Sequence, residues 1–280
     1  MSIKLPNTIM RRSVVLAVTA AAVGLSSLFT GGAAAQATAG ERMNPKPTIV
    51  LVHGAFADAS SWNRVTKRLQ REGYTVMAPA NPLRGTTSDS AYLASVLATV
   101  PGPIVLVAHS YGGVVITNAA TGNPNVKALV YVAAFIPDEG EVGTDLLKFP
   151  GSLLVLAPSP DATVTARPFP GGIDFYVNTE PFRNIFAADL PAEKTALMAA
   201  AQRPLALAGF TDASGPPAWK TIPSWALVAT QDNTIGTANT RFMAKRAAPS
   251  HTVEIDASHA VLLSHPDAVV DLIRQAVRGI

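Results

Sequence analysis

The sequence predicts an α/β protein with a mainly parallel, doubly wound sheet of about six strands and a helical insertion. Two observations lead to this prediction. Short apolar runs alternate with stretches of helical periodicity up to residue 136 and again after residue 218. Between them, residues 137–217 break the alternation and are rich in proline, glycine and aromatic residues. We therefore expect an insertion over the carboxyl edge of the sheet, where such sheets bind ligands.

The composition indicates a large hydrophobic core. The chain has 280 residues, of which 48% are hydrophobic, enough for one sizeable domain or two small ones. We predict an α/β core formed by residues 44–136 and 218–280, and a cap formed by residues 137–217.

The first 37 residues are predicted to be a signal peptide. Lys4, Arg11 and Arg12 precede an apolar stretch, residues 14–29, and the small residues that follow end at Ala37. This order is typical of secretory signals. The sequence around the arginine pair favours the Sec route and leaves the twin-arginine route open, so we expect a periplasmic or secreted protein. An uncleaved membrane anchor is the alternative, but the apolar stretch is short for a span.

The charge balance gives no reason to expect a nucleic-acid partner. Of the 22 Lys and Arg residues, three lie in residues 1–37, which hold no acidic residue, so 19 basic residues balance the 19 acidic ones. We expect no stable membrane insertion once the signal is cleaved. The chain has no cysteine, so disulfides and a thiol nucleophile are excluded. The sequence sets no oligomeric state.

In the first part of the core, strands and helices follow one another in βαβ order. β-Rich runs predict strands, and apolar residues three and four positions apart predict helices, as at Trp62, Val65 and Leu69. The expected elements are strand 48–52, helix 60–72, strand 75–78, helix 88–99, strand 104–108, helix 112–121 and strand 126–133.

The same order resumes after the insertion. The expected elements are strand 224–229, helix 237–247, strand 251–255 and helix 262–278. The insertion itself is expected to contain one helix, residues 191–202. Its aromatic side chains are expected to pack within the insertion or to line a pocket; they include Phe149, Phe169, Phe175, Tyr176, Phe182 and Phe186.

Residues 104–113 contain the strongest functional signal. An apolar strand leads into Ser110, and Gly112 and Gly113 open the next helix. This pattern is typical of a nucleophile elbow, in which a sharp turn strains the serine backbone and glycines let helix and strand approach closely. Ala108 replaces the first glycine of the usual G-x-S-x-G pattern and is small enough for the same packing. On the motif alone, a plain strand-Ser-Gly turn stays open.

A serine nucleophile needs a base and a carboxylate that orients this base. Asp232 follows strand 224–229 and His259 follows strand 251–255, so both are expected at the same sheet edge as Ser110. The order Ser, Asp, His is the one expected for this fold class. We therefore predict that Ser110, His259 and Asp232 form a catalytic triad.

Other residues compete for these roles. Asp256 lies three residues before His259 and is the alternative acid, although it is too close on the same loop to reach Nδ1 easily. A buried structural histidine is the alternative for His259. Among the other histidines, His251 starts a strand at the far edge, His265 lies at a helix start, and the side chain of His109 is displaced from the Ser110 hydroxyl.

The predicted nucleophile also needs donors for a developing oxyanion. One is the amide of Tyr111, directly after the nucleophile, and the other is expected from Ala55 in the loop after the first strand. Gly54 lets this loop turn sharply, and His53 is expected to bond the loop backbone. The sequence indicates no cofactor and no metal site.

With these motifs placed, the chain resembles the α/β-hydrolase superfamily over nearly all its length after the signal peptide. The stretch from His53 to Trp62 and the stretch from His259 to Pro266 are similar to the branch of small carboxylesterases, plant methylesterases and hydroxynitrile lyases. The resemblance implies the α/β-hydrolase fold. It also implies cofactor-free hydrolysis of small-molecule substrates, small to medium hydrophobic carboxylic esters, through an acyl-enzyme on Ser110.

The resemblance leaves two other functions to test. One is a hydroxynitrile lyase-like enzyme; lyases of this branch carry a lysine directly after the catalytic histidine, where this chain has Ala260. The other is a ligand-binding protein on the same fold that turns over very slowly. An intact triad argues against the second.

Overall fold

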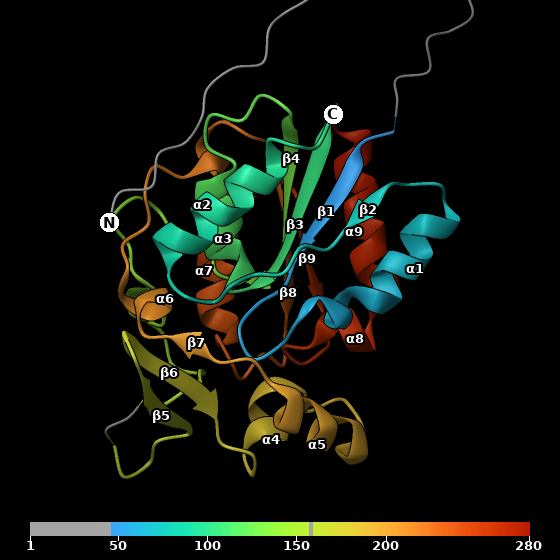
Figure 1. Ribbon diagram of the computed structural model, residues 1–280. Coiled ribbons are helices and arrows are strands. Elements are labelled where there is room, and N and C mark those ends of the chain that lie inside the picture. Colours follow the sequence, from blue (N-terminus) through green and yellow to red (C-terminus); the bar gives the residue numbers. More distant parts are fainter. Residues whose placement is uncertain (1–45, 157–158) are drawn as a thin grey trace, which may run out of the picture. The chain divides into compact units, whose positions relative to one another are not determined.

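The computed structural model describes residues 46–156 and 159–280, so the predicted signal peptide lies outside the described residues. Its main sheet has six parallel strands in the order β2-β1-β3-β4-β8-β9 (Figure 1). These strands are β1 (Thr48–Val52), β2 (Val76–Met77), β3 (Ile104–Ser110), β4 (Val126–Ala134), β8 (Ser224–Ala229) and β9 (Thr252–Ile255). The predicted α/β fold is confirmed.

The central strands are buried along almost their whole length. Every residue of β3 and β8 is buried, and β4 exposes only Lys127. Strands that are covered on both faces become continuous runs of Val, Ile, Leu and Ala, which is why these segments lack the alternation of a half-buried sheet. In the parallel register Val52 pairs with Ala108, so Ser110 lies just beyond the end of β1.

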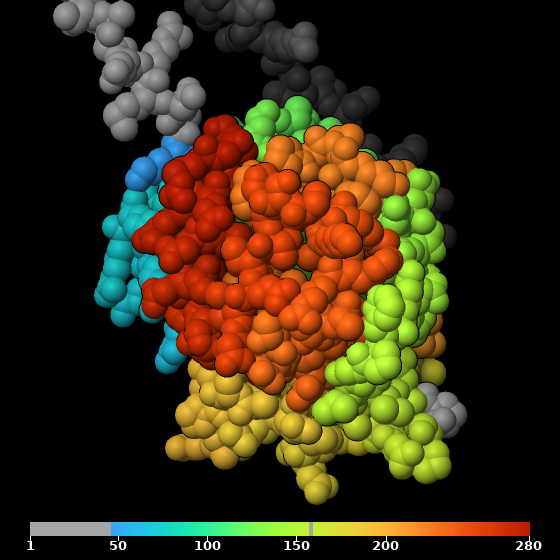
Figure 2. Space-filling model, turned by 180° about the vertical axis from the view of Figure 1, so that it is seen from behind, coloured from blue at the N-terminus to red at the C-terminus, as the bar shows by residue number. Residues whose placement is uncertain are grey.

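Helices cover both faces of this sheet (Figure 1). The bounds are η1 (Ala59–Trp62), α1 (Asn63–Arg71), α2 (Thr86–Leu97), α3 (Gly112–Ala119), η3 (Ala218–Lys220), α7 (Thr237–Ala247), α8 (Val261–Ser264) and α9 (Pro266–Arg278). α2, α3 and α7 lie on one face, and α1 and α9 on the other. Seen from behind, the C-terminal elements form the middle of the surface (Figure 2).

Two helices differ from their predicted extents for local reasons. The expected helix 60–72 begins as the short 3₁₀ turn η1, where the Asp58 carboxylate accepts the amide of Ser60 and caps the turn. The expected helix 262–278 is divided at His265, because Pro266 has no amide hydrogen and suits only the first turn of a new helix.

Residues 137–217 contain more strand than the sequence predicted. The elements are η2 (Gly143–Leu146), β5 (Val164–Phe169), β6 (Gly172–Val177), α4 (Phe182–Phe186), α5 (Ala192–Ala201), β7 (Leu205–Ala206) and α6 (Ala208–Thr211). The expected helix 191–202 is present as α5. However, β5, β6 and β7 form a three-stranded antiparallel sheet, so the expectation of a helical segment with one helix was incomplete.

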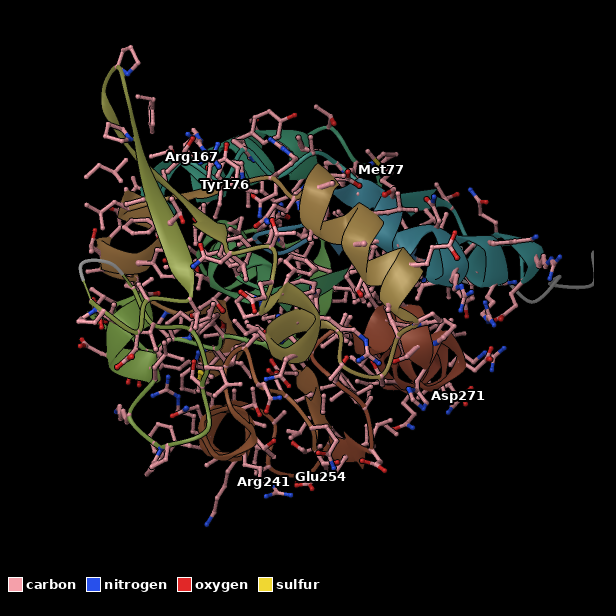
Figure 3. All side chains as sticks on the ribbon, turned by 90° about the horizontal axis from the view of Figure 1, so that it is seen from below. Met77, Arg167, Tyr176, Arg241, Glu254 and Asp271 are labelled. Atoms are coloured by element: carbon pink, nitrogen blue, oxygen red, sulfur yellow. The ribbon has the colours of Figure 1, made fainter. Side chains whose placement is uncertain are left out.

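The antiparallel sheet has a sequence signal in its hairpin. Pro170 and Gly171 separate two β-rich runs, and Gly171 has φ 102°, a conformation that favours glycine. On the hairpin, the Arg167 guanidinium lies 4.8 Å from the centre of the Tyr176 ring (Figure 3).

Figure 3 also shows Arg241 of α7 beside Glu254 of β9, an ion pair of 2.7 Å that joins the edge strand of the main sheet to α7.

The start of α3 lies very close to neighbouring backbone because its first two residues are the glycines Gly112 and Gly113. A Cβ on Gly112 would lie 2.7 Å from the Val52 carbonyl oxygen, and a Cβ on Gly113 would clash with the Phe135 carbonyl oxygen. Both obstacles are backbone atoms, which cannot rotate away.

In the described part of the chain, no helix combines the length and apolar character that crossing a bilayer would require.

We expect Gly113→Ala to lower the free energy of unfolding by about 3 kcal/mol, the upper range for overpacking against a rigid neighbour. Urea unfolding measures the change. Gly122→Ala is the matched control: Gly122 has φ 77° and no atom within 4 Å of an added Cβ, so only backbone strain of about 1 kcal/mol is expected there. Equal losses in the two variants would contradict this packing account.

Candidate active site

Ser110 lies on a strained turn at the carboxyl end of β3. Its φ is 54°, in the left-handed region that residues with a side chain rarely adopt, and α3 begins two residues later. Gly54 makes room for it, because a Cβ on Gly54 would lie 2.5 Å from the Ser110 Cβ and 3.2 Å from its Oγ. The strained serine expected from the sequence is therefore present.

His259 and Asp232 are hydrogen-bonded in the protein interior. Nδ1 of His259 lies 2.9 Å from Oδ2 of Asp232, and both side chains are fully buried. They come from the loops after β9 and β8, as expected. A carboxylate at this position fixes the tautomer of the imidazole, with hydrogen on Nδ1 and a lone pair on Nε2.

The other oxygen of Asp232 holds the carboxylate in place. Oδ1 accepts the amides of Thr234 at 2.8 Å and Ile235 at 3.0 Å. Asp256, the alternative acid, instead accepts hydrogen bonds from the side chains of Thr230 and Gln231. The structure therefore brings Asp232, and not Asp256, to the imidazole.

Nε2 of His259 is buried and has no hydrogen-bond partner among residues 46–156 and 159–280. Aromatic rings surround this imidazole: the Phe186 ring lies edge-on at 5.0 Å, and the His109 ring lies at 4.6 Å between centroids. A buried unpaired nitrogen costs free energy and needs an explanation. A lone pair held ready for a proton is one such explanation.

His109 links the strained turn to the His259 loop. Its Nε2 donates a hydrogen bond to the His259 carbonyl oxygen at 2.9 Å, and its backbone directly precedes Ser110. Burial, together with the nearby His259, holds the pKa of His109 well below its usual value. His109 therefore stays neutral and adds no second positive charge beside His259.

The two amides expected to bind an oxyanion are both buried beside the turn. Ala55 is 3% exposed and Tyr111 2% exposed. Within the described ranges, 46–156 and 159–280, neither amide has a hydrogen-bond acceptor. His53 is structural, as expected: its Nδ1 donates to the Gly54 carbonyl and its Nε2 accepts the amide of Asn81, each at 2.9 Å.

Sequence reasoning missed the support behind Tyr111. Its hydroxyl donates to the Asp89 carboxylate at 2.8 Å, and the same fully buried carboxylate accepts the amides of Arg84 and Gly85. Burial and this negative charge raise the pKa of Tyr111 well above its usual value, so the phenol stays protonated. Asp89 thus fixes the residue whose amide faces the turn. A lone aspartate within a helix carries no sequence signal for such a role.

The inserted segment contacts both loops of the site. The amide of Ala260 donates to the Phe186 carbonyl at 3.0 Å, and the Asp189 carboxylate accepts the amide of Ser258 at 3.1 Å. On the other side, the amide of Phe56 donates to the Arg203 carbonyl at 2.9 Å. The inserted segment is therefore bound to the loops after β9 and β1, and Ser110 between them is 4% exposed.

Some aromatic residues of the insertion pack against one another, whereas Phe149 meets Phe242 of α7. Phe182 stacks on Phe186 at 5.3 Å, and Phe175 meets Phe210 edge-on at 5.8 Å. Phe186 alone among these also touches His259. In the described part of the chain, no group of three or more His, Cys, Asp or Glu side chains is arranged to hold a metal ion.

The comparisons with known proteins agree with this fold. The model of the Alpha/beta hydrolase family matches residues 49–272. The crystal structure of polyneuridine aldehyde esterase has a TM-score of 0.69 at 19% identity and covers 82% of this chain and 99% of that one. The crystal structure of a methylesterase from Arabidopsis has a TM-score of 0.64 at 21% identity and covers 84% and 100%. At such identities the likeness concerns the fold.

Named relatives are similar over different lengths. A carbendazim hydrolyzing esterase from Nocardioides sp. (strain SG-4G) is 29% identical over 44% of this chain and 52% of that protein. A pyrethroid hydrolase from Sphingobium wenxiniae is 27% identical over 80% of this chain and 85% of that protein. Methylesterase 7 and an alpha-hydroxynitrile lyase, both from Arabidopsis thaliana, are 34% and 29% identical over 42% and 50% of their lengths. The chain thus spans about half of three relatives and most of one.

The buried neutral histidines predict an acid-labile fold. Burial lowers the pKa of His53 and His109, so below pH 6.5 the unfolded chain binds more protons than the folded one. Stability should therefore fall as the pH falls below 6.5, with a slope of at most about 1.4 kcal/mol per pH unit for each such histidine. His109→Gln keeps a donor for the His259 carbonyl without the titrating ring, and we expect a shallower slope between pH 6.5 and 5 in urea unfolding.

Substitution of the exposed His265 by Gln is the control for this experiment and should leave the slope unchanged. An unaltered slope in His109→Gln would show that His109 takes up a proton in the folded protein.

Proposed function

The chain belongs to the alpha/beta hydrolase family, and we propose that it is a carboxylesterase with Ser110 as nucleophile, His259 as general base and Asp232 as the residue that orients the base. One observation carries most weight in support. The imidazole of His259 is buried, its Nδ1 is bound by Asp232, and its Nε2 has no partner among residues 46–156 and 159–280. The strained backbone of Ser110, at φ 54°, supports its assignment as the nucleophile.

In the proposed first half-reaction, the Ser110 hydroxyl attacks the ester carbonyl while Nε2 of His259 takes its proton. Asp232 stabilises the imidazolium that forms, and stays ionised. The imidazolium then gives the proton to the departing alcohol, and an acyl-enzyme on Ser110 remains. His109 favours this step because it is neutral, so the new positive charge meets no like charge beside it.

The negative charge on the carbonyl oxygen needs donors that are already in place. The amides of Ala55 and Tyr111 have no acceptor within the described residues, and both belong to short loops fixed by buried hydrogen bonds. Donors held in a dry site stabilise a developing oxyanion without reorganising. α3 begins two residues after Ser110, so the dipole at its N-terminus would favour negative charge there.

In the second half-reaction, water replaces the alcohol. Nε2 of His259 accepts a proton from the water, which attacks the acyl carbon, and the proton then returns to Ser110 as the acid leaves. Every bond made or broken in the two halves uses the same three side chains. The proposed reaction therefore balances with these three side chains and water alone and needs no cofactor.

The substrates that fit this proposal are small to medium hydrophobic esters. Three relatives, the carbendazim hydrolyzing esterase, the pyrethroid hydrolase and methylesterase 7, support ester hydrolysis as the class of reaction. The Phe186 ring of the inserted segment lies against the imidazole, which favours an apolar group beside the scissile bond. We propose that residues 137–217 act as a cap over this site.

The alpha-hydroxynitrile lyase among the relatives makes a lyase the second candidate. Such an activity calls for a cation beside the base, and the residue after His259 is the buried Ala260, whose amide is bound by Phe186. Ester hydrolysis therefore remains the better-supported function. A mandelonitrile-cleavage assay separates the two.

We also propose that the protein is exported. Support comes from the sequence alone: the basic, apolar and small-residue order of residues 1–37, with no acidic side chain. The mature N-terminus measured on protein secreted by the native host tests this proposal, with cleavage after Ala37 expected.

Ser110→Ala should abolish turnover of p-nitrophenyl butyrate, with a fall in kcat of about 10⁴-fold or more because the nucleophile is lost while the fold is kept. Initial rates at saturating ester measure it, with far-UV circular dichroism to confirm folding. Turnover that survives in Ser110→Ala would refute the esterase proposal. A protein that binds esters without turning them over would show no Ser110-dependent rate even in the wild type.

A matched pair of variants tests the acid. Asp232→Asn should lower kcat by about 10⁴-fold, because an amide at Nδ1 favours the wrong imidazole tautomer. Asp256→Asn, on the neighbouring loop, should retain nearly all activity because Asp256 bonds only Thr230 and Gln231. The reverse outcome would assign the orienting role to Asp256.

A further inference from the structure

A hollow of about 400 Å³ opens on the surface between α5 of the insertion and the start of α1 in the core. Figures 1 and 3 place α5 beside α8 and the segment that leads into α1. This volume lies in the usual range of small-molecule sites, about 300–1,000 Å³. The apolar part of its wall consists of Phe56, Ala57, Leu197, Met198, Ala201 and Leu263.

The α5 side of the hollow exposes apolar surface. Leu197 is 68% exposed, the most exposed large hydrophobic residue of the described chain, and it faces the hollow together with the half-buried Met198. Phe56 and Leu263 line the opposite wall and are buried. An apolar chain laid in the hollow would cover Leu197 without moving the core.

Two cations line the same hollow. Arg64 and Lys194 come from α1 and α5, and within residues 46–156 and 159–280 neither lies within 4 Å of a carboxylate. The guanidinium of Arg64 is fixed, because its Nη1 donates to the Leu263 carbonyl at 3.0 Å. Partial burial and the charge of Arg64 lower the pKa of Lys194, so the two positive groups oppose each other.

The acidic residue at the hollow is already engaged. Asp58 lines it, but its Oδ1 accepts the Ser60 amide at 2.7 Å as the cap of η1. The Ser60 hydrogen bond holds the pKa of Asp58 below its usual value, so the carboxylate stays charged. With Arg64 and Lys194, the charged groups of the hollow leave one positive charge in excess.

We propose that this hollow binds a small amphipathic carboxylate, with its apolar chain against Leu197, Met198 and Leu263 and its carboxylate between Lys194 and Arg64. A carboxylate accepts hydrogen bonds from guanidinium and ammonium groups and would relieve their mutual repulsion. Medium-chain acids belong to this class, and so do the acids that hydrophobic esters release. The site itself does not depend on the proposed triad.

Isothermal titration calorimetry of the full chain carrying Ser110→Ala tests the proposal, because this background excludes turnover and a failed esterase proposal would not affect it. Sodium decanoate is the probe, and decanol is its uncharged match. Lys194→Gln should weaken decanoate about tenfold and Lys194→Glu still more, whereas decanol should change less than twofold. Leu197→Asn should weaken both probes.

Lys245→Gln, on the exposed surface of α7, is the matched charge control and should leave both affinities unchanged. Arg64→Gln provides a second test on the opposite wall, and thermal unfolding confirms that each variant is folded. Unchanged decanoate affinity in folded Lys194→Glu would overturn the proposal. Equal losses for decanoate and decanol would overturn it too, because they would place the carboxylate elsewhere.

Discussion

The left-handed turn at Ser110 is the constraint on which the candidate site depends. A serine with φ 54° is held only because the surrounding backbone leaves no alternative: β1 ends beside it, α3 begins two residues later, and Gly54 and Gly112 remove the side chains that would separate these segments. The same close approach brings the loop that contains Gly54 and Ala55 next to Ser110, and Tyr111 follows the serine directly in the chain. The register of β1 and β3, the start of α3 and the geometry of the candidate site therefore depend on one another.

Burial decides the electrostatics around this turn. The imidazole of His259 is out of contact with water, so its bond to Asp232 and the neutrality of His109 count for more than they would at the surface. The two buried carboxylates nearby have partners that fix them: Asp232 accepts two backbone amides, and Asp89 accepts the Tyr111 hydroxyl and two backbone amides. Among residues 46–156 and 159–280, Nε2 of His259 and Nδ1 of His109 are buried without a partner.

Much of this arrangement could be predicted from the sequence because it depends on local patterns. Apolar runs and helical spacing locate the six strands, and loops after β8 and β9 point to Asp232 and His259. The antiparallel sheet was missed because two short half-exposed strands, β5 and β6, carry a weak periodic signal. The contacts of Phe186 and Asp89 were missed because they join residues distant in the chain, and only the folded structure brings such residues together.

The surface beside the site follows from the same fold. α5 contacts the core through its buried side, and its outward side leaves Leu197 and Lys194 facing Arg64 across a hollow. The sequence analysis considered only the aromatic residues of the insertion as candidates for a pocket wall. It therefore overlooked this wall of apolar and basic residues. The inserted segment thus contacts the His259 loop through Phe186 and also lines this hollow through α5.

Covalent labelling with a fluorophosphonate tests the central claim most directly, because only an activated serine reacts at a useful rate. Peptide mass spectrometry of the labelled protein should find one adduct per chain, on the peptide that contains Ser110, and His259→Ala should lose it. An intact protein that stays unlabelled, or an adduct on another residue, would contradict the account.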